Sequence, residues 1–356
     1  MAYTTINDPS AYFQTAIYTG NGDSDDDTNA ITNDGNSDLQ PDWVWIKRRD
    51  YDNQPVLHDS NRGVTKFLST DRTDAEGTIS PTTKFQSFDT DGFTTGSSSG
   101  AYNAENEPFV AWQWKANGGT TSTNTDGDIN STVQVNSTAG FSIVQYNPSN
   151  NTARSIGHGL GVQPQVVIVR ARDRVENWRV FHRSAGTTGS LILDGTSAYN
   201  SSTVLFTADS TSTVFKVGTD FSVNGGYNYI AYCFANVQGY SKFGKYVGNG
   251  NADGPFVYLG FQPAFVMLKS SSIAVPWLMF DNKRDIANGD MDYLLASSNA
   301  AGSNAGLGNS APIDFLSNGF KLRNADAYAS GANTYIYMAF AENPFVTSTG
   351  IPTTAR

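Results

Sequence analysis

The sequence predicts an all-β protein built from three tandem antiparallel β-sandwich modules of a jelly-roll or lectin-like type. Three observations predict it. Four short segments recur three times along the chain in the same order. The recurring segments are rich in β-branched and aromatic residues, which favour strands. Charged residues make up only 16% of the chain, and the Gly, Ser, Thr and Asn that replace them favour turns over helices.

The repeat itself is carried by these four segments, which keep their order and nearly constant spacing in every copy. Each contains a short apolar run bounded by turn-forming residues, as expected of a strand in an antiparallel sheet. In the three copies the segments begin at Tyr12, Phe141 and Tyr240; at Pro41, Pro164 and Pro263; at Pro55, Trp178 and Trp277; and at Pro108, Asn228 and Thr334.

The repeat also sets the expected domain boundaries. Few large apolar groups occur between the first two copies, so we expect a linker or long surface loop there. The second and third copies follow each other almost without a gap, and we expect them to pack closely while the first is freer to shift. The expected parts are an N-terminal arm (1–10), three modules (11–119, 140–237 and 238–345), a linker (120–139) and a C-terminal tail (346–356). The two terminal segments lack a core-forming pattern and are expected to reach a neighbouring subunit.

The last segment of each copy predicts which strand face is buried. Residues two apart on a strand lie on the same face. In each copy one such face carries large apolar side chains, and we expect it to point into the core of its own module. The residues on these faces are Trp112 and Trp114, Tyr232 and Phe234, and Met338 and Phe340. We expect hairpin turns at Asp89 to Gly92 and at Ser317 to Gly319.

Charge and cysteine content exclude several classes of function. The formal net charge is −10, which argues against a nucleic-acid partner and against binding to anionic membranes. No apolar run is long enough for a membrane span, so membrane insertion is not expected. The single cysteine, Cys233, cannot form an intrachain disulfide. The first residues lack the pattern of a signal peptide.

Several motifs resemble a repeat module of structural proteins from marine tailed phages, including cyanophages and pelagiphages. They include PDWVWIKRRD from Pro41, HDSNRG from His58 and YIYMAFAENPF from Tyr335, and the resemblance extends over nearly the whole chain. It implies a place on the exterior of the virion, as a tail fibre or a capsid-surface protein. It also implies other virion proteins as partners and a homo-oligomer, with a trimer favoured. The module has no assigned chemistry, so the resemblance supplies no catalytic residue.

Several polar residues are candidates for a functional site. His58 and His182 are interpreted as matching positions in the repeat, with Asp281 in the third copy, and a structural role at a strand end is favoured over catalysis. Two acidic groups are candidates for calcium, which prefers several oxygen ligands, although each fits a solvated loop as well. They are Asp23, Asp25 and Asp27, and Asp126 and Asp128. No other metal or cofactor is expected.

Three tyrosines in polar, loop-like surroundings are candidates for contact with a host-surface glycan. An exposed aromatic ring can stack on the apolar face of a sugar while nearby amides and carboxylates bind its hydroxyls. The candidates are Tyr51, Tyr199 and Tyr227. The sequence therefore favours a non-enzymatic structural protein of the virion exterior. A carbohydrate-binding receptor-recognition module is the alternative, and a glycan depolymerase is a third and less favoured hypothesis.

Overall fold

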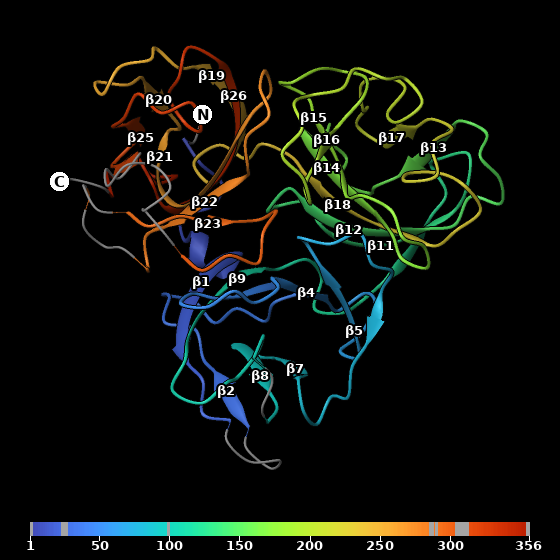
Figure 1. Cartoon of the computed structure of the whole chain (residues 1–356), viewed down its shortest axis with the longest axis horizontal. Helices are drawn as coiled ribbons and strands as arrows, with labels where there is room; N and C mark the ends of the chain where they lie inside the picture. The colour runs from blue at the N-terminus through green and yellow to red at the C-terminus, as the bar shows by residue number, and fades with distance from the viewer. Residues whose placement is uncertain are drawn as a thin grey trace.

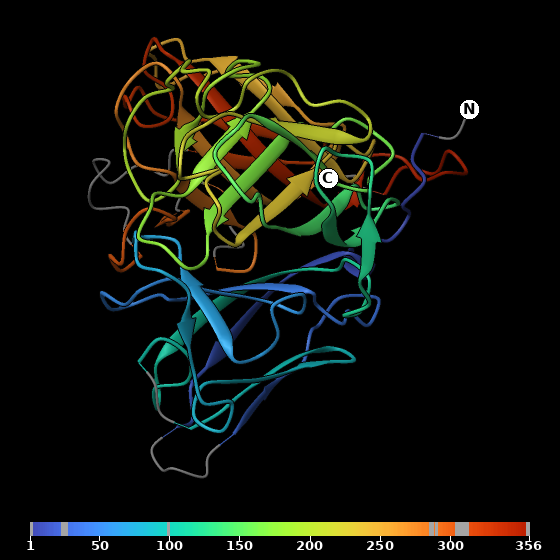
Figure 2. The same cartoon turned by 90° about the vertical axis from the view of Figure 1, so that its right-hand side faces the viewer.

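The all-β prediction is confirmed in the computed structural model, where a single short 3-10 helix, η1 (Pro9–Ala11), accompanies the described strands. Figure 1 shows three lobes in a triangle, and Figure 2 shows lobe 1 beneath the other two. Lobe 1 spans residues 11–119, lobe 2 spans 120–237 and lobe 3 spans 238–345. The structure describes residues 3–22, 28–97, 100–284, 288, 291–302 and 313–353.

Each lobe contains one large antiparallel sheet and one small sheet. In lobe 1 the large sheet has the order β1 (Phe13–Thr19), β9 (Pro108–Trp114), β3 (Trp43–Arg48), β4 (Val56–Asp59), β5 (Lys66–Ser69) and β6 (Gly77–Thr78). Its small sheet has the order β2 (Asn29–Ile31), β8 (Gly92–Thr95) and β7 (Phe85–Asp89).

Lobes 2 and 3 are built from strands in a corresponding order. The large sheet of lobe 2 has β10 (Ser122–Asn124), β11 (Ser131–Asn136), β12 (Phe141–Tyr146), β18 (Tyr229–Phe234), β14 (Val166–Ala171), β15 (Arg179–His182) and β16 (Leu191–Ile192), and its small sheet pairs β13 (Arg154–Gly157) with β17 (Val214–Val217). The large sheet of lobe 3 has β19 (Ser241–Val247), β26 (Thr334–Pro344), β21 (Phe261–Ser270), β22 (Leu278–Asp281) and β23 (Leu294–Leu295), and its small sheet has β20 (Phe256–Tyr258), β25 (Gly319–Leu322) and β24 (Ile313–Leu316).

Every recurring sequence segment forms a strand, and the strands pair in the same way in all three lobes. The strand of the first segment pairs with that of the last, the last with the second, and the second with the third. The registers place Trp112, Tyr232 and Met338 at equivalent positions, because they lie opposite Trp45, Ile168 and Met267 respectively. The two predicted hairpin turns join β7 to β8 and β24 to β25.

Each lobe has a hydrophobic cluster of its own between its two sheets. In lobe 1, Phe85 and Phe93 of the small sheet pack with Val44 and Ala111 of the large sheet. Corresponding clusters fill lobe 2 and lobe 3. The small residue Ala111 therefore lies on the face of β9 that its own lobe covers.

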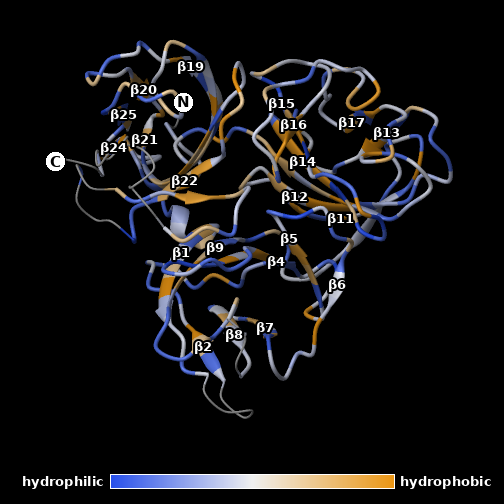
Figure 3. Ribbon diagram, viewed as in Figure 1, coloured by the Kyte–Doolittle hydropathy of each residue, from blue (hydrophilic) through white to orange (hydrophobic). Residues whose placement is uncertain are grey.

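A further cluster lies between the lobes and is shared by all three. The Trp43 ring of lobe 1 lies 4.7 Å from the Tyr232 ring of lobe 2, and the Phe13 ring lies 5.2 Å from the Phe340 ring of lobe 3. In Figure 3 the hydrophobic colour follows the strands of the large sheets. The molecule is thus held together by a central aromatic core in addition to three lobe cores.

The central core corrects two expectations. All six large residues of the last segments are buried, but they face the shared core and not separate module cores: Trp112, Trp114, Tyr232, Phe234, Met338 and Phe340. The reason is that both faces of these central strands are covered, one by the small sheet and the other by the neighbouring lobes. Lobe 1 also packs against both other lobes, so it is not free to shift.

The linker and arm assignments are corrected as well. Residues 120–139 contain β10 and β11, and β11 pairs along its length with β12, so this stretch belongs to the large sheet of lobe 2. The N-terminal segment packs on its own chain: the Tyr3 hydroxyl donates to the Gly260 carbonyl at 2.8 Å, and Ile6 joins the central core. The C-terminal segment meets it where the Ser348 amide donates to Asn7 Oδ1 at 2.7 Å.

Candidate functional site

Three polar contacts connect the lobes into a closed ring at the central core. The ends of β4, β15 and β22 place Asp59, His182 and Asp281 at equivalent positions, opposite β3, β14 and β21, the strands of the second recurring segment. Each of them bonds to the last strand of another lobe. The contacts are Tyr232 hydroxyl to Asp59 Oδ2 at 2.7 Å, His182 Nε2 to Tyr337 carbonyl at 3.1 Å, and Trp112 Nε1 to Asp281 Oδ2 at 3.1 Å.

The contact at His182 differs chemically from the other two, and its neighbour explains why. Tyr232 and Trp112 each have a hydrogen-bond donor, but the equivalent Met338 has none. His182 therefore donates to the adjacent Tyr337 carbonyl, and its Nδ1 accepts from the Ser184 amide at 3.3 Å. Both nitrogens are used by the neutral ring, and burial lowers the pKa of His182 to about 4.

A second ring is formed by three buried cations at another set of equivalent strand positions. Each cation donates to a backbone carbonyl of another lobe: Lys47 to Asn299 at 2.8 Å, Lys269 to Thr196 at 3.1 Å, and Arg170 to Asp74. Burial lowers the pKa of Lys47 and of Lys269 to about 8. These contacts join lobe 1 to lobe 3, lobe 3 to lobe 2 and lobe 2 to lobe 1, so each pair of lobes is joined by both rings.

Lobes 1 and 2 also share a buried ion-pair network. Arg62 bonds Asp59 at 2.5 Å and Glu76 at 3.1 Å, and Arg172 of lobe 2 bonds the same Glu76 at 2.8 Å. Removing one member of such a network leaves an uncompensated buried charge, so a network of this kind favours one relative placement of the lobes.

The histidine interpretation is corrected in its register. The position that matches His182 is Asp59, because Asp59 lies opposite Trp43 as His182 lies opposite Val166. His58 faces the core of lobe 1, where its ring stacks on Phe85 at 4.4 Å and its Nε2 lies 3.0 Å from the Tyr102 hydroxyl. Burial lowers the pKa of His58 well below its ordinary value.

The acidic calcium candidates divide into two groups. Asp23, Asp25 and Asp27 lie outside the described residues. Asp128 closes a loop, because its Oδ2 accepts hydrogen bonds from the Ser155 amide at 2.7 Å and the Ser155 hydroxyl at 2.8 Å. Asp126 Oδ2 accepts a hydrogen bond from the Asn124 side-chain Nδ2 at 2.9 Å. Within the part of the chain that the structure describes, no three His, Cys, Asp or Glu side chains gather as a metal site would require.

The three predicted glycan-contact tyrosines have different neighbours and do not form one site. Tyr51 is 61% exposed, and the Arg48 guanidinium lies 4.9 Å from its ring centre. Tyr227 is half-buried, and its hydroxyl accepts a hydrogen bond from Arg174 at 2.7 Å. Tyr199 is half-buried at the contact between lobes 2 and 3, where its amide donates to the Ser271 carbonyl at 3.0 Å.

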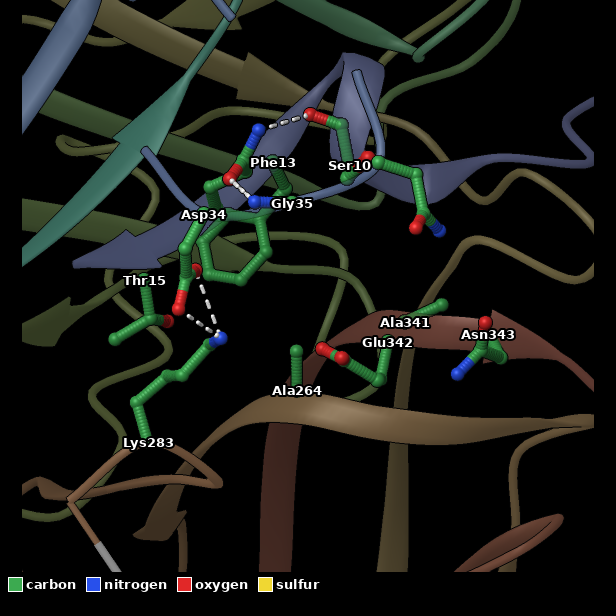
Figure 4. Close-up of a pocket in the computed structure, with 12 residues that line it drawn as sticks. Ser10, Phe13, Thr15, Asp34, Gly35, Ala264, Lys283, Ala341, Glu342 and Asn343 are labelled. Carbon is green, nitrogen blue, oxygen red and sulfur yellow. Dashed lines mark hydrogen bonds and ion pairs between the residues drawn. The ribbon is translucent and has the colours of Figure 1, made fainter. Parts of the chain in front are cut away.

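A polar cavity of 290 Å³ lies between lobes 1 and 3. Figure 4 shows Phe13 beside Asp34, and Glu342 pointing into the space opposite them. Lys283 of lobe 3 bonds Asp34 of lobe 1 at 2.8 Å, so its charge is already paired within the protein. We interpret this cavity as a part of the contact between lobes 1 and 3, which the Lys283–Asp34 ion pair stabilises.

A second cavity, of 390 Å³, lies on lobe 3 where the N-terminal segment crosses it. Its aromatic wall is made by Tyr3 and Tyr258, and Lys242 of β19 also lines it. Sequence reasoning missed these residues. The available signal was the alternation in β20, where the exposed Phe256 and Tyr258 flank the buried Val257.

Comparison with curated proteins found no match to this chain, and comparison with solved structures found none either. No helix among the described residues is long and apolar enough to cross a membrane. A family model described as a domain of unknown function, DUF7483, matches residues 8–344. The matched region includes residues of all three lobes. The chain belongs to the DUF7483 family.

Proposed function

We propose that this chain is a structural protein of the phage virion exterior, either a tail fibre component or a capsid-surface decoration protein. The observation that carries the proposal is the closed ring of three lobes around a shared aromatic core. Cyclic hydrogen bonds and buried cations hold each lobe against the others. Such a body presents loops and outer sheet faces in fixed positions, which suits attachment to neighbouring virion proteins and contact with a host surface.

The finer architecture is part of the same proposal. The three lobes are copies of one antiparallel sandwich module of the jelly-roll or lectin-like type. The identical pairing order of the four recurring strands supports this, as does the small sheet that covers each large sheet. The proposal includes assembly of several chains into a homo-oligomer, with a trimer favoured, as the sequence resemblance to structural proteins of marine tailed phages implies.

A non-enzymatic role fits the use of the buried polar groups. His182, Asp59 and Asp281 each bond across a lobe boundary. A nucleophile or general base must instead reach a substrate. The polar chemistry in the centre of the molecule is therefore committed to assembly of the ring.

Carbohydrate binding is the second candidate function, and exposed aromatic residues favour it. Phe221 is 43% exposed beside Tyr227, and Tyr258 is 49% exposed beside the cavity of lobe 3. Aromatic rings on a rigid β-surface are suited to stacking against pyranose rings. Sugar binding would give the virion surface protein a receptor-recognition role.

The virion proposal is tested by locating the chain in particles. Antibodies raised against the purified chain should label the outside of gradient-purified phage from a culture that produces it, as seen by immunogold electron microscopy. Mass spectrometry of the same particles should detect the chain at a stoichiometry set by the particle's symmetry. Finding it only in the soluble fraction of the lysate, with unlabelled particles, would refute the proposal.

A further inference from the structure

The cavity on lobe 3 contains a cation with no acidic partner. Lys242 makes no ion pair with any residue that the structure describes, and its ammonium donates only to the Tyr258 carbonyl, at 2.7 Å. An ammonium group has three N–H donors, so two are left for a ligand. In two other cavities the lining cations are paired, Lys283 with Asp34 and Arg172 with Glu76. Among the described lining residues of these three cavities, Lys242 is thus the cation that is available to an external anion.

The wall of this cavity is aromatic and held in place. Tyr258 is 49% exposed, and the Lys242 ammonium lies 5.2 Å from its ring centre. The Tyr3 hydroxyl lies 3.2 Å from the Tyr258 hydroxyl and donates to the Gly260 carbonyl at 2.8 Å. The ring of Tyr258 thus projects from the edge strand β20 with its hydroxyl fixed and part of its surface open to solvent.

The rest of the lining is neutral. Asn236 uses its Oδ1 to accept a bond from the Phe243 amide at 2.8 Å, which leaves its side-chain N–H groups for a ligand. The remaining lining groups include Val237, Leu259 and Gly260, and no carboxylate is among the lining residues. The chain as a whole has 33 acidic and 23 basic residues, so a cavity with a free lysine and no acid departs from the surrounding surface.

We propose that Lys242, Tyr258, Tyr3 and Asn236 form a binding subsite for a carboxylated pyranose, that is, a uronic acid residue of a host-surface polysaccharide. The sugar carboxylate pairs with Lys242, an apolar face of the pyranose stacks on Tyr258, and its hydroxyls bond Asn236. The volume of 390 Å³ lies near the small end of the range of about 300–1,000 Å³ for small-molecule sites, which suits one monosaccharide unit.

Each alternative ligand would leave part of the site unused. A neutral sugar would leave the lysine without a partner, and an inorganic anion would leave the aromatic ring uncovered. The proposal rests on the carbohydrate-binding candidate above, but it concerns the isolated chain. Loss of sugar binding would not affect the location of the chain in particles, and failure to find the chain in particles would not affect binding in solution.

The test is a titration of the full chain with glucuronate and with glucose, in which ligand-observed saturation-transfer NMR detects the bound sugar. Inorganic phosphate is added as a competitor. We expect glucuronate to bind, and glucose to bind at least about fivefold more weakly, since a hydrogen bond to a charged group is lost. Lys242→Gln should weaken glucuronate binding by a similar factor and remove the preference over glucose. Tyr258→Ala should weaken both sugars roughly tenfold, since the stacking surface is lost, while Tyr258→Phe should retain most binding.

Two control variants change similar side chains outside the cavity lining. Lys245→Gln removes an exposed lysine from the same strand, β19, and Phe256→Ala removes an exposed aromatic ring from β20 that does not line the cavity. Both should bind glucuronate like the unmodified chain. Thermal melting of every variant identifies any that fails to fold. If Tyr258→Ala does not fold, the proposal is tested by Tyr258→Phe, which should retain most glucuronate binding, and by Lys242→Gln, which should weaken it.

Three outcomes would overturn the assignment. Glucuronate could fail to bind, or it could bind equally well to the Lys242→Gln chain. Phosphate could compete with it while the Tyr258→Ala chain binds both normally, which would mark a site that recognises charge alone.

Discussion

Replacement of Trp112 by Ala tests the shared core most directly. The side chain is fully buried, and its indole nitrogen donates to Asp281 of lobe 3 at 3.1 Å. Loss of a buried Trp side chain costs about 3–5 kcal/mol. Loss of a donor to a buried carboxylate adds about 1–3 kcal/mol. Asp281 keeps its bond to Arg284 at 2.6 Å, so the total should be about 4–8 kcal/mol of unfolding free energy, with the carboxylate still paired.

Which lobes lose stability is more informative than the total loss of unfolding free energy. Because Trp112 packs in the core that all three lobes share, its removal should loosen strands of lobe 3 as well as lobe 1. Urea unfolding measures the total, and hydrogen–deuterium exchange with mass spectrometry locates it. We expect faster exchange in β22 and β26 as well as in β9. Phe93→Ala is the matched control, because Phe93 is equally buried but lies in the core of lobe 1 alone.

Two results would refute the reasoning. Exchange changes confined to residues 11–119 in the Trp112→Ala chain would mean that the lobes do not share a core. The reasoning would also fail if Phe93→Ala, which truncates a residue inside lobe 1, raised hydrogen exchange in lobe 3 as much as Trp112→Ala does.

Three further predictions concern buried polar groups. Burial lowers the pKa of His182 and His158 to about 4 from an ordinary 6.5, so between these values the unfolded chain binds protons that the folded chain does not. Stability to urea should therefore fall as pH falls from 6.5 toward 4, by up to about 1.4 kcal/mol per pH unit for each histidine, and a flat profile would contradict this. Tyr232→Phe removes the 2.7 Å bond to Asp59 and should cost about 1–3 kcal/mol in urea unfolding; no loss would show that the contact does not hold the ring. Burial raises the pKa of the Cys233 thiol, so Ellman's reagent should label it only after unfolding, and rapid labelling of the native chain would be inconsistent with its position.

Local sequence pattern was sufficient to predict the all-β fold and the strands of the recurring segments. The recurring segments begin close to β1, β12 and β19 and to their partners, and turn residues such as those before Gly92 mark the hairpins. Strands and turns depend on residues that are close together in the sequence, so the local pattern is enough to predict them. The alternation of large and small residues in β9 also predicted that Trp112 and Trp114 share a buried face.

Pattern could not tell which partner covers that face. Both faces of β9 are buried, and the Ala111 face belongs to the lobe core while the Trp112 face belongs to the central core. Both faces carry hydrophobic residues, so hydrophobicity does not distinguish a face that packs in the lobe core from one that packs in the central core. That difference depends on how distant segments of the chain pack together. The lobe 3 cavity was missed for a similar reason, because it joins Tyr3 to Tyr258 across 255 positions of the chain.

Because the three lobes belong to one polypeptide, equivalent positions in different lobes can carry different residues. In an assembly of three identical chains, every substitution appears three times around the axis. Here the strands β1, β12 and β19 place Gln14, Ser142 and Lys242 at the same position of their sheets, because each lies opposite a matching residue of the last strand. One lobe thus carries a half-buried lysine at a position where the other two lobes keep buried neutral residues, and a single gene can vary one lobe without changing the contacts that join it to the others.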